Sequence, residues 1–590
     1  MRPVAVVALA LALVPAARAG TAPTTRTTTP AASKTSGASS TIPTQQLPAA
    51  ETTPRTKRAE VIHRFLADGK VADWLTHYPP HPETDATFAL GVWTVTVSSG
   101  RAGQIATGKV DDASGAVTEA WTGPQVAWKM ARGYKGAFGG AKINNTWVWL
   151  SFCALFLAGL VDWRRPLSLR NVDLVVLLSF SVSLWFFNHG NVFASAPLAY
   201  PPLIWLLVRC LWLARSDRPP RGAPVWPVWV LAAATVFVAG FRVGLNVRAS
   251  NVIDVGYSGI IGAERIAHGQ SPYGHFPVED DRPKCGPADS DGEVRDRVQT
   301  NGRCENANPS GDTYGPVSYL AYLPGYAIFG WSGQWDSLPG VHFTSILFDL
   351  LAALGLALVG RRFGGPRLAA TLAFAWVAWP FTQYASSSNT NDAIAPALLI
   401  WGFLGLTSPL ARGAAVALSG WTKFASLLLL PLWLGYPEVR RGRTLTILGF
   451  SLATALAFFC LFFERSPWHA AIVFFDRTAR FQIGRDSPFS LWDWRQYHAK
   501  GLPDLHLVQR GLQVLLVAGA LALAVVPKHR SPLRMAALTA ALLIGFELVL
   551  TYWIYLYLPW FFPFVALALV APLPGTAKEA ERDTPAPAVA

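Results

Sequence analysis

Long apolar blocks separated by short polar or arginine-containing segments dominate the chain after Asn144. Most blocks run for about 17–25 residues, the length of a helix that crosses the hydrocarbon core of a bilayer. This pattern predicts an all-α polytopic membrane protein with about eleven transmembrane helices. The predicted spans are Trp147–Val161, Val172–Phe187, Val192–Leu213, Val225–Leu245, Val341–Val359, Leu368–Tyr384, Ala393–Leu406, Leu445–Phe463, Val508–Val526, Ala536–Leu550 and Leu558–Val570.

Two further apolar stretches do not fit a single crossing. Val317–Phe329 is short and follows Pro316, so we expect it to dip into the membrane or to lie at its outer interface. Gly413–Leu434 is interrupted at Trp421-Thr422-Lys423, so we expect it to enter the membrane and return. Non-helical backbone at membrane depth is tolerated only where protein or a water-filled cavity surrounds it. Both stretches are therefore candidate linings of a site.

The segment Asn251–Tyr273 has a different pattern. Its apolar residues recur at roughly helical spacing, with polar residues on the other side, which predicts a short helix lying on the membrane surface. Asp254 stands where the preceding span should leave the bilayer. A carboxylate at the mouth of a membrane protein is a functional-site hypothesis, and a solvated loop acid is the alternative.

The sequence before the first span is predicted to form three parts. Met1–Ala19 has an apolar run and a small-x-small ending, as in a secretory signal peptide, although an uncleaved signal anchor has the same features. Both interpretations place the following residues outside the cell. Gly20–Lys57 is rich in Thr, Ser, Pro and Ala, which predicts a disordered tether. Arg58–Gly140 predicts a small extracytoplasmic α+β domain.

Within this domain, an amphipathic segment, Ala59–Leu75, precedes a predicted strand at Phe88–Val97. Gln104–Val110 and Ala116–Trp121 then flank a predicted hairpin turn. The helix-then-hairpin order resembles a PepSY-type domain, a fold associated with membrane proteins. The resemblance implies an accessory module and no particular chemistry.

The net charge of +14 comes mostly from arginines that cluster between the apolar blocks. Such clusters are typical of topology signals rather than of a nucleic-acid surface, so we expect no nucleic-acid partner. If the clusters are cytoplasmic, the protein is a multi-pass plasma-membrane protein with its N-terminal domain outside and its C-terminus inside. The clusters are Arg164, Arg165 and Arg170; Arg215, Arg218 and Arg221; Arg361, Arg362 and Arg367; Arg440, Arg441 and Arg443; and Lys528, Arg530 and Arg534.

This topology gathers several polar groups on the outer face. They include Asp254, the Asn389-Thr390-Asn391-Asp392 stretch, Phe474–Trp494, and Lys423 at the tip of its re-entrant segment. A carboxylate, amides and cations around one cavity suit a base, a sugar-binding surface and a phosphate clamp. The structural alternatives are a snorkelling lysine, helix-capping amides and arginine anchors of a surface helix. The aromatic residues from Tyr552 to Trp560 predict an interfacial belt, or a surface that stacks on a sugar.

The five cysteines predict at most one structural bridge. Cys153, Cys210 and Cys460 lie in apolar spans and are expected to be small core residues. Cys285 and Cys304 share one polar loop, where a disulfide is expected if the loop lies outside the cytoplasm. No spacing of His and Cys residues suggests a metal site.

Several short motifs follow one another from Val225 onward. They are Asp254 and Tyr257; Gly269-Gln270-Ser271-Pro272-Tyr273; Tyr314-Gly315-Pro316; Ser388–Asp392; Leu418–Leu430 with Lys423; and Arg485-Asp486-Ser487. Together they resemble the GT-C superfamily of membrane glycosyltransferases, especially the family 87 mannosyltransferases that use polyprenyl-phosphate mannose. Gly315 replaces the first proline of the family's Tyr-Pro-Pro stretch, and the late motif differs at two of three positions from the family's Asn-Gln-Ser.

The resemblance implies a transferase core at 225–571, preceded by three accessory helices at 147–221 and followed by a cytoplasmic tail at 572–590. It implies transfer of a mannose-like or other sugar from polyprenyl phosphate to an acceptor hydroxyl, with inversion, in the cell envelope. The acceptor would be a glycolipid, polysaccharide or glycoprotein, membrane lipid would surround the core, and no metal or other cofactor is expected. Asp254 would be the general base. The residues implied in substrate binding are Tyr257, Tyr273, Tyr314, Asn389, Asn391, Asp392, Lys423, Arg480 and Arg485.

Two non-enzymatic classes compete with this interpretation. A protein with many spans, broken helices and a polar mouth could be a transporter. Alternatively, the spans could anchor a wall-sensing scaffold whose N-terminal domain binds a ligand.

Overall fold

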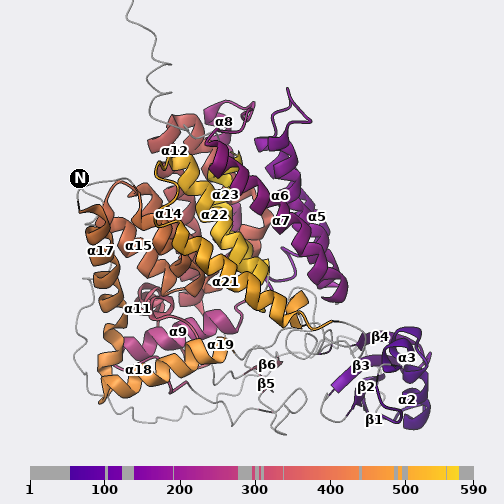
Figure 1. Ribbon diagram of the computed structural model, residues 1–590. Helices are drawn as coiled ribbons and strands as arrows, with labels where there is room; N and C mark the ends of the chain where they lie inside the picture. Colours follow the sequence, from indigo (N-terminus) through magenta and orange to yellow (C-terminus); the bar gives the residue numbers. More distant parts are fainter. Residues whose placement is uncertain are drawn as a thin grey trace, which may run out of the picture. The chain divides into compact units, whose positions relative to one another are not determined.

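The structure, a computed structural model, describes most of the chain from residue 53 to residue 570 (Figure 1). The predicted signal peptide, the tether up to residue 52, the C-terminal tail, Cys285 and Arg485 lie outside the described residues. The described residues are 53–76, 78–99, 104–122, 126, 138–189, 192–276, 283, 296–298, 304–306, 311–335, 338–436, 441–483, 489–493, 503–552 and 555–570.

The N-terminal region contains two short helices followed by a four-stranded sheet in the order β1-β2-β3-β4. The predicted hairpin is confirmed, because β3 and β4 flank the expected turn. The single strand predicted at Phe88–Val97 is wrong: Leu90 and Gly91 both have positive φ angles and form a turn between β1 and β2. The elements are α2 (Arg58–Leu66), α3 (Gly69–Leu75), β1 (Glu83–Ala89), β2 (Val92–Ser98), β3 (Gln104–Asp111) and β4 (Val117–Thr122).

A buried carboxylate organises the turn side of this sheet. Asp112 accepts hydrogen bonds from the Arg55 N–H at 2.7 Å, the Thr56 N–H at 3.0 Å and Trp93 Nε1 at 2.8 Å. Burial alone would raise the pKa of Asp112, but these hydrogen bonds stabilise its charged form and bring the pKa below its ordinary value. The carboxylate therefore connects the segment before α2 to the sheet.

The helical bundle follows from residue 138 onward and includes short 3₁₀ and π segments, which are labelled η. Its first half comprises α5 (Thr146–Leu160), α6 (Leu169–Asn188), α7 (Val192–Ser216), α8 (Val228–Ala249), α9 (Asp254–Ala267), β5 (Asp296–Val298), β6 (Cys304–Asn306), α10 (Pro316–Leu320), α11 (Leu323–Phe329), α12 (Pro339–Ala378), α13 (Pro380–Ser387) and η2 (Asn391–Ala393). Its second half comprises α14 (Ile394–Leu404), α15 (Pro409–Gly420), η3 (Phe424–Leu429), α16 (Leu430–Leu434), α17 (Gly442–Ala457), η4 (Phe458–Phe463), α18 (Pro467–Phe475), η5 (Asp476–Arg480), α19 (Phe481–Ile483), η6 (Leu491–Asp493), α21 (His506–Ala522), α22 (Pro532–Val549), η7 (Tyr555–Tyr557), α23 (Leu558–Val565) and η8 (Ala566–Val570).

Six helices in the described part of the chain are long and apolar enough to cross a membrane. The protein is therefore a helical membrane protein with a small N-terminal sheet region. Shorter apolar helices cover other predicted spans, and the count of eleven and the sidedness stay predictions. In α12, Gly365 has a φ of 76° and a ψ of −167°, so the helix is broken between the predicted spans Val341–Val359 and Leu368–Tyr384. The six helices are Leu169–Asn188, Ala194–Ser216, Val228–Ala249, Pro339–Ala378, Gly442–Phe463 and Pro532–Val549.

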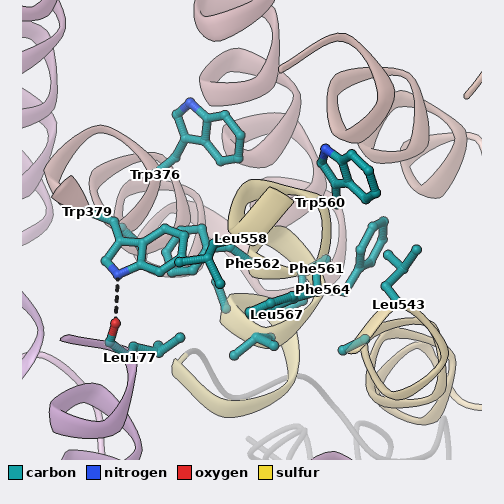
Figure 2. Close-up of a cluster of buried hydrophobic side chains, with 14 of the residues drawn as sticks. Leu177, Trp376, Trp379, Leu543, Leu558, Trp560, Phe561, Phe562, Phe564 and Leu567 are labelled. Carbon is teal, nitrogen blue, oxygen red and sulfur yellow. Dashed lines mark hydrogen bonds between the residues drawn. The ribbon is translucent and has the colours of Figure 1, made fainter. Parts of the chain in front are cut away.

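Aromatic packing joins α12, α23 and α6 at the centre of the bundle (Figure 2). Trp379, between α12 and α13, stacks on Phe562 of α23 with ring centroids 4.0 Å apart and an interplanar angle of 13°. Its indole Nε1 donates to the carbonyl oxygen of Leu177 in α6 at 3.2 Å. The three segments are thus held by apolar burial together with a satisfied indole N–H.

A buried ion pair connects α8 to α12. Arg242 Nε lies 3.1 Å from an oxygen of Asp349, and its Nη1 donates to Thr382 Oγ1 at 3.0 Å. Trp376 Nε1 donates to the same carboxylate at 2.9 Å. Burying two charges is costly unless their hydrogen-bonding groups find partners, and here both charges do.

This aromatic packing predicts that two phenylalanines of the bundle contribute very differently to the stability of the protein. Phe562→Ala should destabilise the protein by about 3–5 kcal/mol, because it removes a fully buried ring and leaves a cavity. Phe237→Ala, in α8 at 76% exposure, should change stability by about 0.5 kcal/mol or less. Thermal unfolding of both variants in detergent measures the difference, and equal melting temperatures would contradict this packing.

Candidate functional site

A cavity of about 270 Å³ brings together four of the residues predicted from the sequence. Asp254, Tyr314, Asp392 and Lys423 all line it, although they come from four separate segments of the bundle. Most of the remaining wall is apolar or aromatic, which is typical of a site for an organic ligand held by a few polar groups. The aromatic lining residues are Phe138, Tyr314, Phe424, Phe546, Tyr552, Tyr557 and Trp560.

Asp254 reaches the cavity because α9 begins at this residue. Ile253 is extended, with φ −102° and ψ 173°, and Asp254 is the acidic residue of the first turn, where a negative charge interacts favourably with the helix dipole. The carboxylate is half-buried at the cavity wall. The predicted helix at this position is confirmed.

Three glycines at a spacing of three residues let α9 approach its neighbours closely. A Cβ atom on Gly256 would lie 2.2 Å from the carbonyl oxygen of Asn389. Cβ atoms on Gly259 and Gly262 would lie 2.4 Å and 2.1 Å from the rings of Tyr322 and Tyr319. Larger residues at these positions would push the start of α9, and Asp254 with it, away from the polar loop before α14. This spacing of glycines is itself a sequence signal for close packing of α9.

Lys423 occupies the break between α15 and η3, as the interrupted apolar pattern predicted. Its backbone is extended, and its side chain is 9% exposed. The ammonium lies 3.0 Å from Asp392 Oδ1. It also lies 4.9 Å from the ring centre of Tyr314 and 5.4 Å from those of Tyr557 and Trp560. Lys423 therefore does not snorkel to a surface, because its charge is held among a carboxylate and three aromatic faces.

Hydrogen bonds from Trp560 of α23 and from the nearby Thr390 fix the Asp392 carboxylate. Trp560 Nε1 donates to Oδ1 at 3.1 Å, and Thr390 Oγ1 donates to Oδ2 at 2.7 Å. The Thr390 hydroxyl also accepts from the Asp392 N–H at 3.2 Å, so Thr390 is the capping residue of η2. The carboxylate of Asp392 is consequently available to orient Lys423.

Asn389 and Asn391 are buried and do not line the cavity. Asn389 has a φ of 52°, and its Nδ2 donates to Ser250 Oγ and to the Asn251 carbonyl, both at 2.8 Å. Its Oδ1 accepts from Asn246 Nδ2 at 2.9 Å. These contacts hold the residues just before Asp254, so Asn389 positions the site rather than contacting a ligand in this cavity.

The tyrosines predicted to bind substrate have different positions. Tyr314 lines the cavity, while Tyr273 is buried and donates its hydroxyl to the Tyr314 carbonyl at 2.9 Å. Tyr257 stacks on Trp335 with centroids 4.5 Å apart and does not line the cavity. Only Tyr314 can therefore touch a ligand there directly, and Tyr273 supports it.

A steric constraint explains why the residue after Tyr314 is a glycine. A Cβ atom on Gly315 would lie 2.0 Å from the carbonyl oxygen of Trp421, at the end of α15. The same carbonyl accepts from the Val317 N–H at 3.2 Å, and the Thr422 carbonyl accepts from Ser318 Oγ at 3.1 Å. The start of α10 thus satisfies the carbonyl groups exposed by the helix break.

Of the two arginines predicted to bind substrate, only Arg480 can be placed, because Arg485 lies outside the described residues. Arg480 is exposed, does not line the cavity, and lies 3.6 Å from Asp476. Arg477 instead lies 3.4 Å from Asp312, which also accepts from the Gly274 N–H at 2.6 Å. Burial raises the pKa of Asp312, and these two donors oppose that shift. The pair fixes the loop that carries Tyr314.

The sequence predicted Tyr557 and Trp560 as part of an interfacial belt or of a sugar-stacking surface, but it did not predict their contacts with Lys423. Tyr557 and Trp560 face Lys423, and Trp560 is 6% exposed. Tyr555 is buried and shares a hydrogen bond of 2.6 Å with Ser183. The interfacial-belt interpretation is therefore wrong for Tyr555 and Trp560.

In the described part of the chain, no group of three His, Cys, Asp or Glu side chains could hold a metal ion.

The Lys423–Asp392 pair predicts strong coupling between two substitutions. Lys423→Met alone should cost about 3–5 kcal/mol, because it leaves a buried carboxylate without its cation. The double variant Lys423→Met/Asp392→Asn should cost clearly less than the sum of the two single changes. Thermal unfolding of the four proteins in detergent measures this coupling.

The exposed pair Arg480–Asp476 is the matched control. Its double-mutant cycle, with Arg480→Met and Asp476→Asn, should give a coupling of about 1 kcal/mol or less. Additive effects at Lys423 and Asp392 would contradict the geometry of the buried pair.

Comparison of the chain with protein-family models gives no match, and comparison with curated proteins gives none either. The function of this cavity has to be inferred from its own residues.

Proposed function

We propose that this protein is an integral-membrane glycosyltransferase of the GT-C type. It would transfer a sugar from a polyprenyl-phosphate donor to an acceptor hydroxyl at the outer face of the membrane, with inversion at the anomeric carbon. The observation that carries this proposal is the presence of a half-buried carboxylate, Asp254, and a buried cation, Lys423, in one aromatic cavity. These are the two charges that this reaction needs.

Asp254 is the general base of the proposed reaction. Its carboxylate takes the proton of the acceptor hydroxyl while the oxygen forms a bond to the anomeric carbon. The bond from that carbon to the phosphate oxygen breaks, and its electron pair leaves with the polyprenyl phosphate. A carboxylate suits this step because the transition state resembles an oxocarbenium ion, which a nearby negative charge stabilises.

Lys423 stabilises the charge that develops on the leaving phosphate. An ammonium group has three N–H donors, so it can keep its contact with Asp392 while it donates to a phosphate oxygen. Thr390 and Trp560 hold Asp392 before any ligand binds, so the cation needs little reorganisation during the reaction. Arg485, which lies outside the described residues, remains a candidate for a second contact to the phosphate.

An adjoining apolar cavity supports a lipid-linked donor. It has a volume of about 420 Å³ and shares Phe424, Phe546 and Leu550 with the first cavity. The rest of its wall is almost entirely aliphatic and comes from η3, α16, α21 and α22. A polyprenyl chain with its phosphate at Lys423 would find a continuous apolar surface there, bordered by the second half of the re-entrant segment.

The buried charges of the long helices do not favour the transporter alternative. In the Arg242–Asp349 pair and in the Arg209–Asp173 pair, each charge is neutralised by its own partner within the bundle. Neither pair lines the two cavities described above, whereas a transport path is expected to expose charged groups near the middle of the membrane.

Replacement of the proposed base tests this function. In purified protein, Asp254→Asn should lower sugar transfer by at least about 100-fold, because an amide cannot accept the acceptor proton. Donors would be polyprenyl-phosphate mannose, glucose and arabinose, and acceptors would be octyl glycosides of the same sugars. Transfer is measured by radiolabel, and donor binding by thermal shift should be unchanged.

Glu264→Gln is the control, because Glu264 lies on the same helix and does not line the cavity. This variant should keep near-normal transfer. Near-normal transfer by Asp254→Asn would refute the assignment of the base. Absence of transfer by the wild-type protein from every donor would refute the proposed function itself.

A further inference from the structure

The segment just before α5 forms part of the cavity. Phe138 lines the same cavity as Asp254 and is 5% exposed. Its ring packs against Tyr384, at 6.4 Å between centroids, and against Phe187, at 6.0 Å. The sequence had assigned this residue to the end of the N-terminal domain, outside the transferase core. A segment that belongs to the additions before residue 225 therefore contributes directly to the site.

Hydrogen bonds fix this segment as a turn. Asn144 Nδ2 donates to the carbonyl oxygens of Phe138 at 2.7 Å and Gly140 at 2.9 Å. Asn188, at the end of α6, donates from its Nδ2 to Asn144 Oδ1 at 2.7 Å. Gly139 and Gly140 have φ angles of 74° and 87°, which glycine adopts without strain. The accessory helix α6 thus holds Phe138 in place.

The contacts of the turn place Phe138 on the side of the cavity that carries the base. A Cβ atom on Gly140 would lie 2.3 Å from the carbonyl oxygen of Ala249, at the end of α8, a few residues before Asp254. The same Cβ atom would lie 3.2 Å from Ser250 Cα, four residues before the base, and Ile253 lines the cavity together with Phe138. The aromatic faces around Lys423 are different residues, namely Tyr314, Tyr557 and Trp560.

We propose that Phe138 is a specificity-determining residue that forms the wall of the acceptor subsite. This inference rests on the proposed function, in which the acceptor hydroxyl lies at Asp254 and the donor phosphate at Lys423. The flat face of an aromatic ring packs against the C–H face of a sugar ring, so Phe138 selects an acceptor whose terminal sugar fits between its ring and the base. The turn at 138–145 makes the accessory helices part of acceptor recognition.

The test compares Phe138 with Phe403 of α14, a buried phenylalanine that does not line the cavity. Phe138→Ala should raise the KM for the octyl glycoside that the wild-type protein uses best by about tenfold, because loss of one ring contact is worth on the order of 1.4 kcal/mol. The KM for the polyprenyl-phosphate donor should not change. Phe403→Ala, which removes a fully buried ring that packs against Phe363 and Trp433 and does not line the cavity, should leave both KM values unchanged. Phe138→Tyr should restore the acceptor KM.

The outcomes separate this inference from the proposed function. Transfer by the wild-type protein together with equal acceptor KM values for Phe138→Ala and Phe403→Ala overturns the role of Phe138 alone. Absence of transfer by the wild-type protein overturns both proposals. If Phe138→Ala does not fold, Phe138→Leu keeps much of the volume without the aromatic face and should still raise the acceptor KM. An unchanged acceptor KM in Phe138→Leu then counts against the inference.

Discussion

The polar loop between α13 and α14 is the constraint on which the site depends, because residues 386–392 are almost completely buried. Polar groups inside an apolar bundle must find partners within the protein, since no water or lipid headgroup can replace them. Asn389 finds them at Asn246, Ser250 and Asn251, and Asp392 finds them at Thr390, Trp560 and Lys423. The need to satisfy this loop therefore fixes both the start of α9 and the position of the lysine.

This constraint gives the cavity its preorganised charges. The position of Asp254 at the cavity has two causes. Asn389 holds the segment that follows α8, and the glycines of α9 allow this helix to pack closely. Lys423 lines the same cavity at a helix break whose exposed carbonyl groups are satisfied by α10. Both charged groups are thus supported by packing and hydrogen bonds that form when the chain folds. Electrostatic stabilisation is most effective when its groups are fixed in this way.

The sequence predicts the local features of this arrangement and few of its long-range pairs. The break at Lys423 and the helix after Ile253 follow from interruptions and periodicity of apolar residues, which are properties of neighbouring positions. The turn at Leu90-Gly91 was missed because its flanks continue the strand-like composition. The contacts of Trp560 with Asp392 and of Phe138 with Tyr384 join segments far apart in the chain, and no local pattern marks them.

Two buried ion pairs in this protein differ in whether a ligand in the cavity can reach them, and this difference decides their roles. The Arg242–Asp349 pair is enclosed by Trp376 and Thr382, and it lies away from the cavity, so its charges can only stabilise the packing of α8 on α12. The Lys423–Asp392 pair is nearly as buried, but both of its side chains form the cavity wall. A ligand phosphate can therefore join the second pair and not the first. Burial makes each pair costly to break, and contact with the cavity makes one of them chemically useful.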